Sequence, residues 1–167
     1  MKKFAILAIV ALLISVPVFA QTTTSTSKVI TATISANLNI TGGFTSTAQT
    51  IPSGGGTTSL GDITIASNMA TAWTVTITST KFGRMKASGI AENIPYTVTF
   101  RPAGTGTTPV ISAQSLGNGT TGTPQSASVT TGVATVVYTL EVTNATFSTS
   151  LPAGTYDDTI TLTISPN

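Results

Sequence analysis

The sequence predicts an all-β protein, folded as a two-sheet β-sandwich of seven or eight short strands. Apolar and polar residues alternate with a period of two from residue 30 to the end of the chain, as on half-buried strands. No segment combines the 3.6-residue apolar spacing and the capping residues of a helix. Gly, Pro and Asn turns separate the alternating segments. This pattern is typical of two sheets packed face to face, with a closed barrel as the alternative.

Residues 1–20 have the pattern of a cleaved signal peptide. Lys2 and Lys3 precede an apolar run from Phe4 to Val16, and the leader ends in small or modest side chains up to Ala20. The apolar run is shorter than the roughly 20 residues of a membrane-spanning helix. We therefore expect cleavage before Gln21, export, and a mature chain that does not insert into a membrane.

The mature chain of 147 residues suits a single domain with its own core. Residues 21–28 form a flexible polar tail, and the domain is placed at residues 29–167. Five basic residues balance five acidic ones in the mature chain, so the pI of 9.2 reflects the leader and does not indicate nucleic-acid binding. Because cysteine is absent, the exported fold depends on its core, its backbone ladders or contacts with neighbouring chains.

Residues 29–40 show the most regular alternation in the chain. Thr, Ser and Asn occupy one face, and the other face carries Ile30, Ala32, Ile34, Ala36, Leu38 and Ile40. Two interpretations are open. The segment is either the first strand of its own domain or a polymerisation strand that adds to the sheet of a neighbouring copy.

Further alternating segments follow between turn residues. A weak strand is expected at 47–51, and stronger strands at 60–66, 71–80, 95–100, 110–116, 134–142 and 156–164. Residues 81–93 and 117–124 are expected to be irregular. The inward positions give the predicted core: Trp73, Val75, Ile77, Tyr96, Val98, Phe100, Tyr138, Leu140, Tyr156, Ile160, Leu162 and Ile164.

The residue inventory argues against catalysis. The chain has no His and no Cys, so the usual zinc ligands and a Ser-His-Asp triad are missing. Asp157 and Asp158 are adjacent, but neighbours on a strand point to opposite faces, which does not suit a shared calcium ion. We expect no enzymatic activity, no catalytic residue, no cofactor and no metal.

Two further features bear on ligand binding. Lys81, Arg84 and Lys86 form a positive cluster that suits an anionic glycan, yet three charges give little affinity in physiological salt. Trp73 is the type of residue that stacks on a sugar, but it shares a strand face with Val75, which favours core packing. A solvated loop and a core tryptophan are the favoured interpretations.

Two segments carry a family resemblance. Lys28 to Ile40 alternates without interruption, and Leu151 to Ile164 combines a turn, a tyrosine and a terminal strand. Together they resemble the major pilins of the alternate chaperone-usher, colonisation-factor type, and more loosely spore coat U-like proteins. The resemblance implies an immunoglobulin-like sandwich that lacks one strand, filled by the N-terminal extension of the next subunit. It also implies a periplasmic chaperone and an outer-membrane usher as partners.

The resulting expectation is a non-catalytic structural subunit of a cell-surface or extracellular fibre, exported through the periplasm in a Gram-negative host. Its partners would be copies of itself, joined by donation of residues 29–40. The alternative is a monomeric secreted adhesive or carbohydrate-binding β-sandwich. Such a module should expose a row of aromatic side chains on one sheet face, whereas most aromatic residues here fall in apolar registers.

Overall fold

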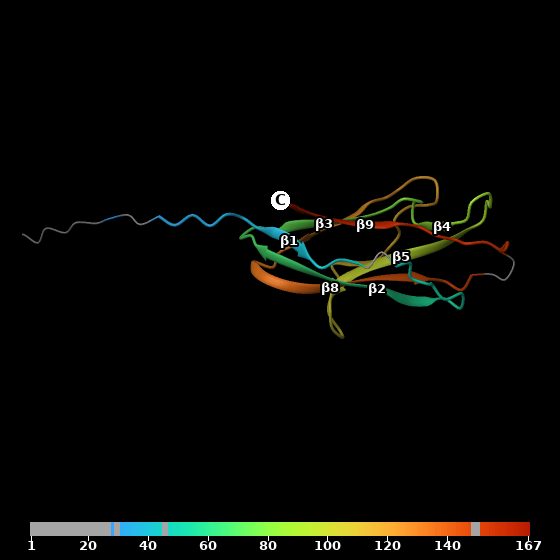
Figure 1. Ribbon diagram of the computed structural model, residues 1–167, viewed down its shortest axis with the longest axis horizontal. Coiled ribbons are helices and arrows are strands. Elements are labelled where there is room, and N and C mark those ends of the chain that lie inside the picture. The colour runs from blue at the N-terminus through green and yellow to red at the C-terminus, as the bar shows by residue number, and fades with distance from the viewer. Residues whose placement is uncertain (1–27, 29–30, 45–46, 148–150) are drawn as a thin grey trace, which may run out of the picture. The chain divides into compact units, whose positions relative to one another are not determined.

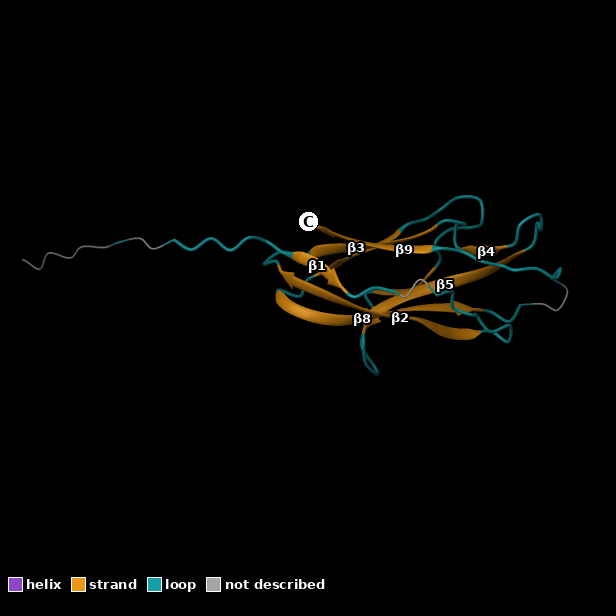
Figure 2. Ribbon diagram, in the orientation of Figure 1, coloured by secondary structure: helices purple, strands orange, loops and turns teal. Residues whose placement is uncertain are grey.

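The computed structural model describes Lys28 and residues 31–44, 47–147 and 151–167. The expected signal peptide, tail residues 21–27 and Ile30 lie outside the described residues. The chain divides into two units, Met1–Thr33 and Ile34–Asn167, and all assigned strands belong to the second. None of the described residues is helical, as Figure 2 shows, so the predicted all-β class is confirmed.

Nine strands in the described part of the chain form two sheets, seen as two layers in Figure 1. The larger sheet has the order β1 (Leu38–Thr41), β2 (Gly56–Asn68), β8 (Val133–Asn144), β5 (Asn93–Pro102) and β4 (Arg84–Lys86), and β6 (Ile111–Gln114) also pairs with β5. The smaller sheet has the order β7 (Gln125–Val129), β3 (Trp73–Ser79) and β9 (Ile160–Pro166). The strands form two distinct sheets, as expected for a sandwich.

The core lies between the sheets and contains most of the predicted inward residues. Trp73 is completely buried and meets the ring of Tyr138 edge to face at 6.0 Å, while Phe100 stacks on Tyr138 at 4.9 Å. Both geometries are favourable for aromatic pairs. The buried members of the predicted set are Trp73, Val75, Ile77, Tyr96, Val98, Phe100, Tyr138 and Leu140.

Three local differences from the sequence expectation have simple causes. Residues 47–51 form no strand, and they lie along the groove described below. β4 interrupts the segment expected to be irregular, because Met85 is buried and its neighbours pair with β5. β7 was not expected, since Gln125–Val129 contains mainly small or polar side chains. This segment forms a strand because it pairs with β3, which apolar alternation does not predict. With β4 and β7, the described residues contain nine strands rather than the expected seven or eight.

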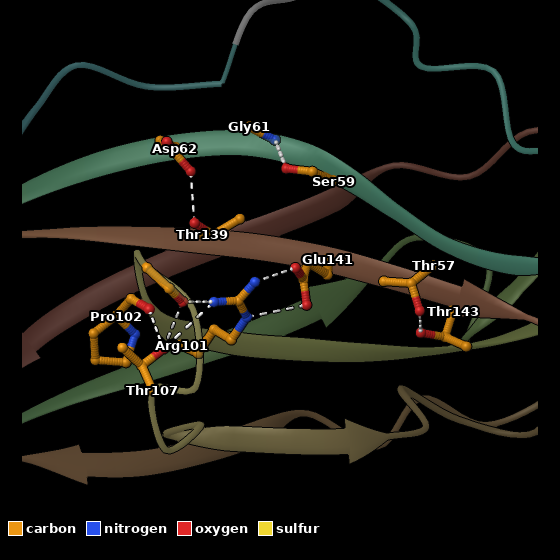
Figure 3. A network of polar contacts seen from close by, with 11 residues as sticks. Thr57, Ser59, Gly61, Asp62, Arg101, Pro102, Thr107, Thr139, Glu141 and Thr143 are labelled. Atoms are coloured by element: carbon orange, nitrogen blue, oxygen red, sulfur yellow. Dashed lines mark hydrogen bonds and ion pairs between the residues drawn. The ribbon is translucent and has the colours of Figure 1, made fainter.

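The outer face of the larger sheet carries a polar network (Figure 3). Arg101 forms an ion pair with Glu141 at 2.7 Å and donates to the carbonyl of Gly104 at 2.5 Å. The Thr139 hydroxyl donates to Asp62 at 2.6 Å. Residues 139 and 141 alternate along β8 with inward-facing residues, so this network lies on the face opposite the core.

Candidate binding groove beside strand β9

An apolar groove opens over the inner face of the larger sheet and has a volume of about 760 Å³. The sheet contributes Leu60, Met85, Ile94, Tyr96, Leu140 and Val142 to its lining. The rest comes from the chain after β1 (Phe44 and residues 47–51), from Phe147, and from the residues that lead into β9 (154–160). The smaller sheet has three strands against six in the larger one, so chain segments outside the strands pack over this part of the inner face, where Met85, Ile94, Tyr96, Leu140 and Val142 are buried.

A β-bulge in β2 turns Leu60 into the groove. The pairing of β2 with β8 shifts register between Ser59 and Gly61, so residue 60 is an extra residue on this strand. Gly61 has φ +120°, a conformation that favours glycine. One extra residue reverses the face on which the preceding side chains point. Leu60 therefore lies on the same face as Ile63, although an unbroken strand would place the two on opposite faces.

Strand β9 has one paired edge, formed with β3 along its whole length. The backbone bond from the N–H of Thr80 to the carbonyl of Thr159 (3.0 Å) shows that the odd-numbered positions here face β3. In an antiparallel ladder this orientation alternates. The backbone groups of Ile160, Leu162 and Ile164 therefore point away from β3, and no strand of the described chain pairs with them. Such an edge can accept a further strand.

The inward side chains at the end of the chain are only half-buried. Tyr156, Ile160, Leu162 and Ile164 pack against the core from one side. The sequence placed all four in the core together with the β3 residue Val75, which has no exposed surface. The structure corrects this expectation because β3 is flanked by two strands, whereas β9 is the last strand of its sheet.

Asp158 fixes the chain where it enters β9. One carboxylate oxygen accepts hydrogen bonds from the hydroxyls of Ser79 and Tyr96, both at 2.6 Å. The other accepts from the Thr80 hydroxyl and from the Lys81 N–H, both at 2.9 Å. Burial, followed by the bond to Asp158, raises the pKa of the Tyr96 phenol. Asp158 therefore ties the start of β9 to the end of β3 and to β5, which keeps this end of the groove in place.

Lys81 and Lys86 of the positive cluster, together with Asp157, are engaged within the domain, whereas the Nε of Arg84 is buried without a hydrogen-bond partner among the described residues. Lys81 forms an ion pair with Asp157 at 2.7 Å, and Lys86 donates to the carbonyl of Gly119 beside the Phe82 ring. The backbone of Lys86 also bonds in both directions to that of Asp157. Among the described residues, no three His, Cys, Asp or Glu side chains form a group suited to a metal ion. These contacts give the charged residues a structural role in holding β4 against the lead-in to β9.

The predicted polymerisation strand is divided between two environments. Residues 31–37 are exposed and belong to no strand, and the side chain of Ile34 is 84% exposed. Leu38 and Ile40 instead lie in β1, where they pair with β2 and pack against their own core. The structure therefore corrects the expected donor segment at its C-terminal end, because the domain uses Leu38 and Ile40 for its own sheet. Ile30 lies outside the described residues.

Aromatic side chains do not form a row for stacking on a sugar in the part of the chain that the structure describes. Trp73, Tyr96, Phe100 and Tyr138 are buried, whereas Phe44, Phe147 and Tyr156 are partly buried and lie in the lining of the groove rather than on an outer sheet face. Phe82 is 38% exposed and lies in a turn beside Lys86. This placement disfavours a flat aromatic carbohydrate site on either sheet.

The groove itself was not identified from the sequence. Its lining joins seven separate segments, and it depends on a bulge and on the unequal sizes of two sheets. The only local signal was the aliphatic face of residues 160–164, which looks the same for a core strand and an edge strand.

Comparison with known proteins found no matching family model and no matching curated protein. Within the described residues, no helix has the length and apolar character needed to cross a bilayer.

Proposed function

We propose that this protein is a non-catalytic structural subunit of a cell-surface or extracellular fibre, in which each copy inserts its N-terminal segment into the groove of the next. The observation that carries this proposal is the apolar groove beside the free edge of β9. Residues 28–37 of a second copy, here named the donor segment, are the proposed occupant. The described part of this segment is exposed and has the alternation that such a groove requires.

The donor segment matches the groove in length. Residues 154–160 line the groove and would extend over about 20–23 Å. Residues 30–36 cover the same distance when extended and carry Ile30, Ala32, Ile34 and Ala36 on one face. Small and large aliphatic residues therefore alternate over the length that the groove offers.

Insertion antiparallel to β9 gives a head-to-tail fibre. The donor segment leaves its own domain at Leu38, at the end where β3 begins and β9 terminates. β9 runs toward this end from Ile160, so an antiparallel donor leaves the acceptor at the opposite end, beside the residues that lead into β9. The donor's own domain then lies beyond the end of the acceptor at which the chain enters β9. The same contact repeats in one direction, and it has no twofold symmetry that would stop growth at a dimer.

The energetics favour a durable contact. Ile34 is almost entirely exposed, and burying it and Ile30 would contribute roughly 3–6 kcal/mol before the costs of ordering and association. Backbone bonds to Ile160 and Leu162, which would lie opposite residues 30 and 28 of the donor segment, would add to this term. Before assembly the groove and the exposed segment are both prone to non-specific association. An assembly chaperone and an outer-membrane usher are therefore reasonable partners for an exported chain of this kind.

The test compares two substitutions on opposite faces of the donor segment. Ile34→Asp places a charge on the face proposed to be buried, and Thr33→Asp places the same charge one residue away on the other face. Both positions are exposed, so we expect unchanged thermal unfolding of the subunit in both variants. We expect the mature wild type and Thr33→Asp to form polymers in sedimentation velocity and electron microscopy, while Ile34→Asp remains monomeric.

Polymers of Ile34→Asp that match those of the wild type would contradict the proposal. So would a wild-type chain that stays monomeric at high concentration. The latter result would favour the monomeric secreted module instead.

A further inference from the structure

A second hollow lies at the end of the domain from which the donor segment leaves. It has a volume of about 360 Å³ and is lined by the end of β2 (Ala66–Asn68), the start of β8 (Val133–Thr135) and Asn37. Val133 is 83% exposed although it is a large aliphatic residue at the start of a strand. We name the surface formed by these lining residues the exit surface.

Asn68 fixes the direction in which the chain passes this surface. Its backbone N–H donates to the carbonyl of Asn37 at 3.0 Å, and its side-chain oxygen accepts from the N–H of Asn37 at 2.5 Å. Its side-chain amide also donates to the carbonyl of Ser35 at 2.8 Å. Three hydrogen bonds from one residue therefore hold residues 35–37 beside the hollow.

We propose that the exit surface is a docking surface for a second copy of this chain, namely the copy whose groove holds the donor segment. This inference rests on the proposed function. Ile34 is the last large side chain of the donor segment, and Leu38 is the first residue of β1. The chain between them spans at most about 13 Å. With Ser35 and Asn37 held by Asn68, the acceptor has to lie against the exit surface.

Two observations identify the neighbouring copy as the occupant: the apolar character of the exit surface and the short chain between Ile34 and Leu38. Burial of Val133 removes an exposed aliphatic side chain from water, which favours an apolar contact. None of the described residues that line the hollow is charged, so a highly charged ligand is not favoured. The neighbouring copy is brought there by a covalent connection of a few residues, which raises its effective concentration at this surface.

The experiment measures assembly and peptide binding separately. Val133→Asp in the mature chain should raise the critical concentration for assembly about tenfold, equivalent to about 1.4 kcal/mol. The control is Val137→Asp, which lies outside the hollow on the same face of β8, about 13 Å along the strand from Val133, and whose exposed fraction is 41%. We expect this control to assemble like the wild type.

A second measurement uses chains that also carry Ile34→Asp. These chains can bind a donor segment in their groove but cannot donate their own. A synthetic peptide of residues 28–37 should bind equally well to this acceptor with and without Val133→Asp, since the peptide brings no domain to dock. Assembly of Val133→Asp at the wild-type critical concentration would overturn the inference. A tenfold loss of peptide affinity caused by Val133→Asp would also overturn it, because the effect on assembly would then come from the groove. Failure of the peptide to bind any acceptor would instead overturn the proposed function.

Discussion

A buried tyrosine and a carboxylate meet at the start of β9. Tyr96 is 4% exposed, and its hydroxyl donates to Asp158, which also accepts from Ser79. The phenol is therefore held in its neutral form by burial and by a charged acceptor. This arrangement links the stability of the groove end to the protonation of one side chain.

Stability should fall when the pH rises above about 10, the ordinary pKa of tyrosine. The pKa of Tyr96 is raised in the folded protein, so the unfolded chain loses this proton first as the pH increases. The stabilisation is complete below that pH and is lost above it, by at most about 1.4 kcal/mol per pH unit for one tyrosine. Denaturant unfolding between pH 8 and pH 11 measures this slope.

Tyr96→Phe should be less stable at pH 8, because the bond to Asp158 is lost. It should also show a shallower decline above pH 10. Burial raises the pKa of Tyr138 as well, so part of the decline should persist in the variant. Equal slopes for the two proteins would show that Tyr96 does not retain its proton in the fold.

At the scale of elements, the turn between β3 and β4 depends on close packing. Gly83 has φ +72°, and a Cβ there would lie 2.8 Å from the backbone nitrogen of Gly117. Gly89 has nearly the same φ, +73°, but a Cβ there would meet no atom within 4 Å. A comparison of alanine substitutions at Gly83 and Gly89 therefore distinguishes the cost of backbone strain from the cost of a steric clash.

Gly83→Ala should destabilise the protein clearly more than Gly89→Ala. Both substitutions place alanine in the left-handed region, at about 1–2 kcal/mol each. Only Gly83→Ala also forces the turn away from Gly117, and backbone atoms cannot move aside as a flexible side chain does. Equilibrium unfolding of the two variants gives the comparison. Equal losses of stability would mean that the turn does not pack against Gly117 as described.

The strands that alternate most clearly were predictable from the sequence, and their environments were less so. Alternation around Val75, Val98 and Leu140 marks strands whose inner faces are covered by the opposite sheet. The same alternation occurs at Leu162, although β9 has one free edge. An alternation with a period of two predicts which face of the sheet a side chain lies on, but it does not predict whether another strand pairs with each edge. β7 could not be predicted from alternation, because Gln125–Val129 becomes a strand through its pairing with β3.

The donor segment shows the same division. Its alternation continues across residue 37 without a break, yet the structure assigns Leu38–Thr41 to the domain and leaves residues 31–37 outside any strand. The boundary depends on the hydrogen bonds of Asn68 and on the pairing register with β2. Both are long-range contacts, so sequence alternation alone does not locate it.

At the scale of the whole molecule, the described residues combine a free edge of β9, an apolar groove and an exposed segment of alternating residues. Each feature is a risk of aggregation in a monomer. Under the proposed strand addition, the donor segment of one copy would pair with the β9 edge of the next copy and fill its groove. Strand addition is therefore the account that explains all three features.

The most direct test is amide hydrogen exchange at β9 in the Ile34→Asp chain, with and without the peptide of residues 28–37. The N–H groups of Ile160, Leu162 and Ile164 point to the free edge, whereas those of Thr161 and Thr163 already face β3. We predict that the peptide slows exchange at Ile160 and Leu162, which would lie opposite residues 30 and 28, and changes it little at the two threonines. Peptide binding that leaves exchange at Ile160 and Leu162 unchanged would contradict strand addition at β9.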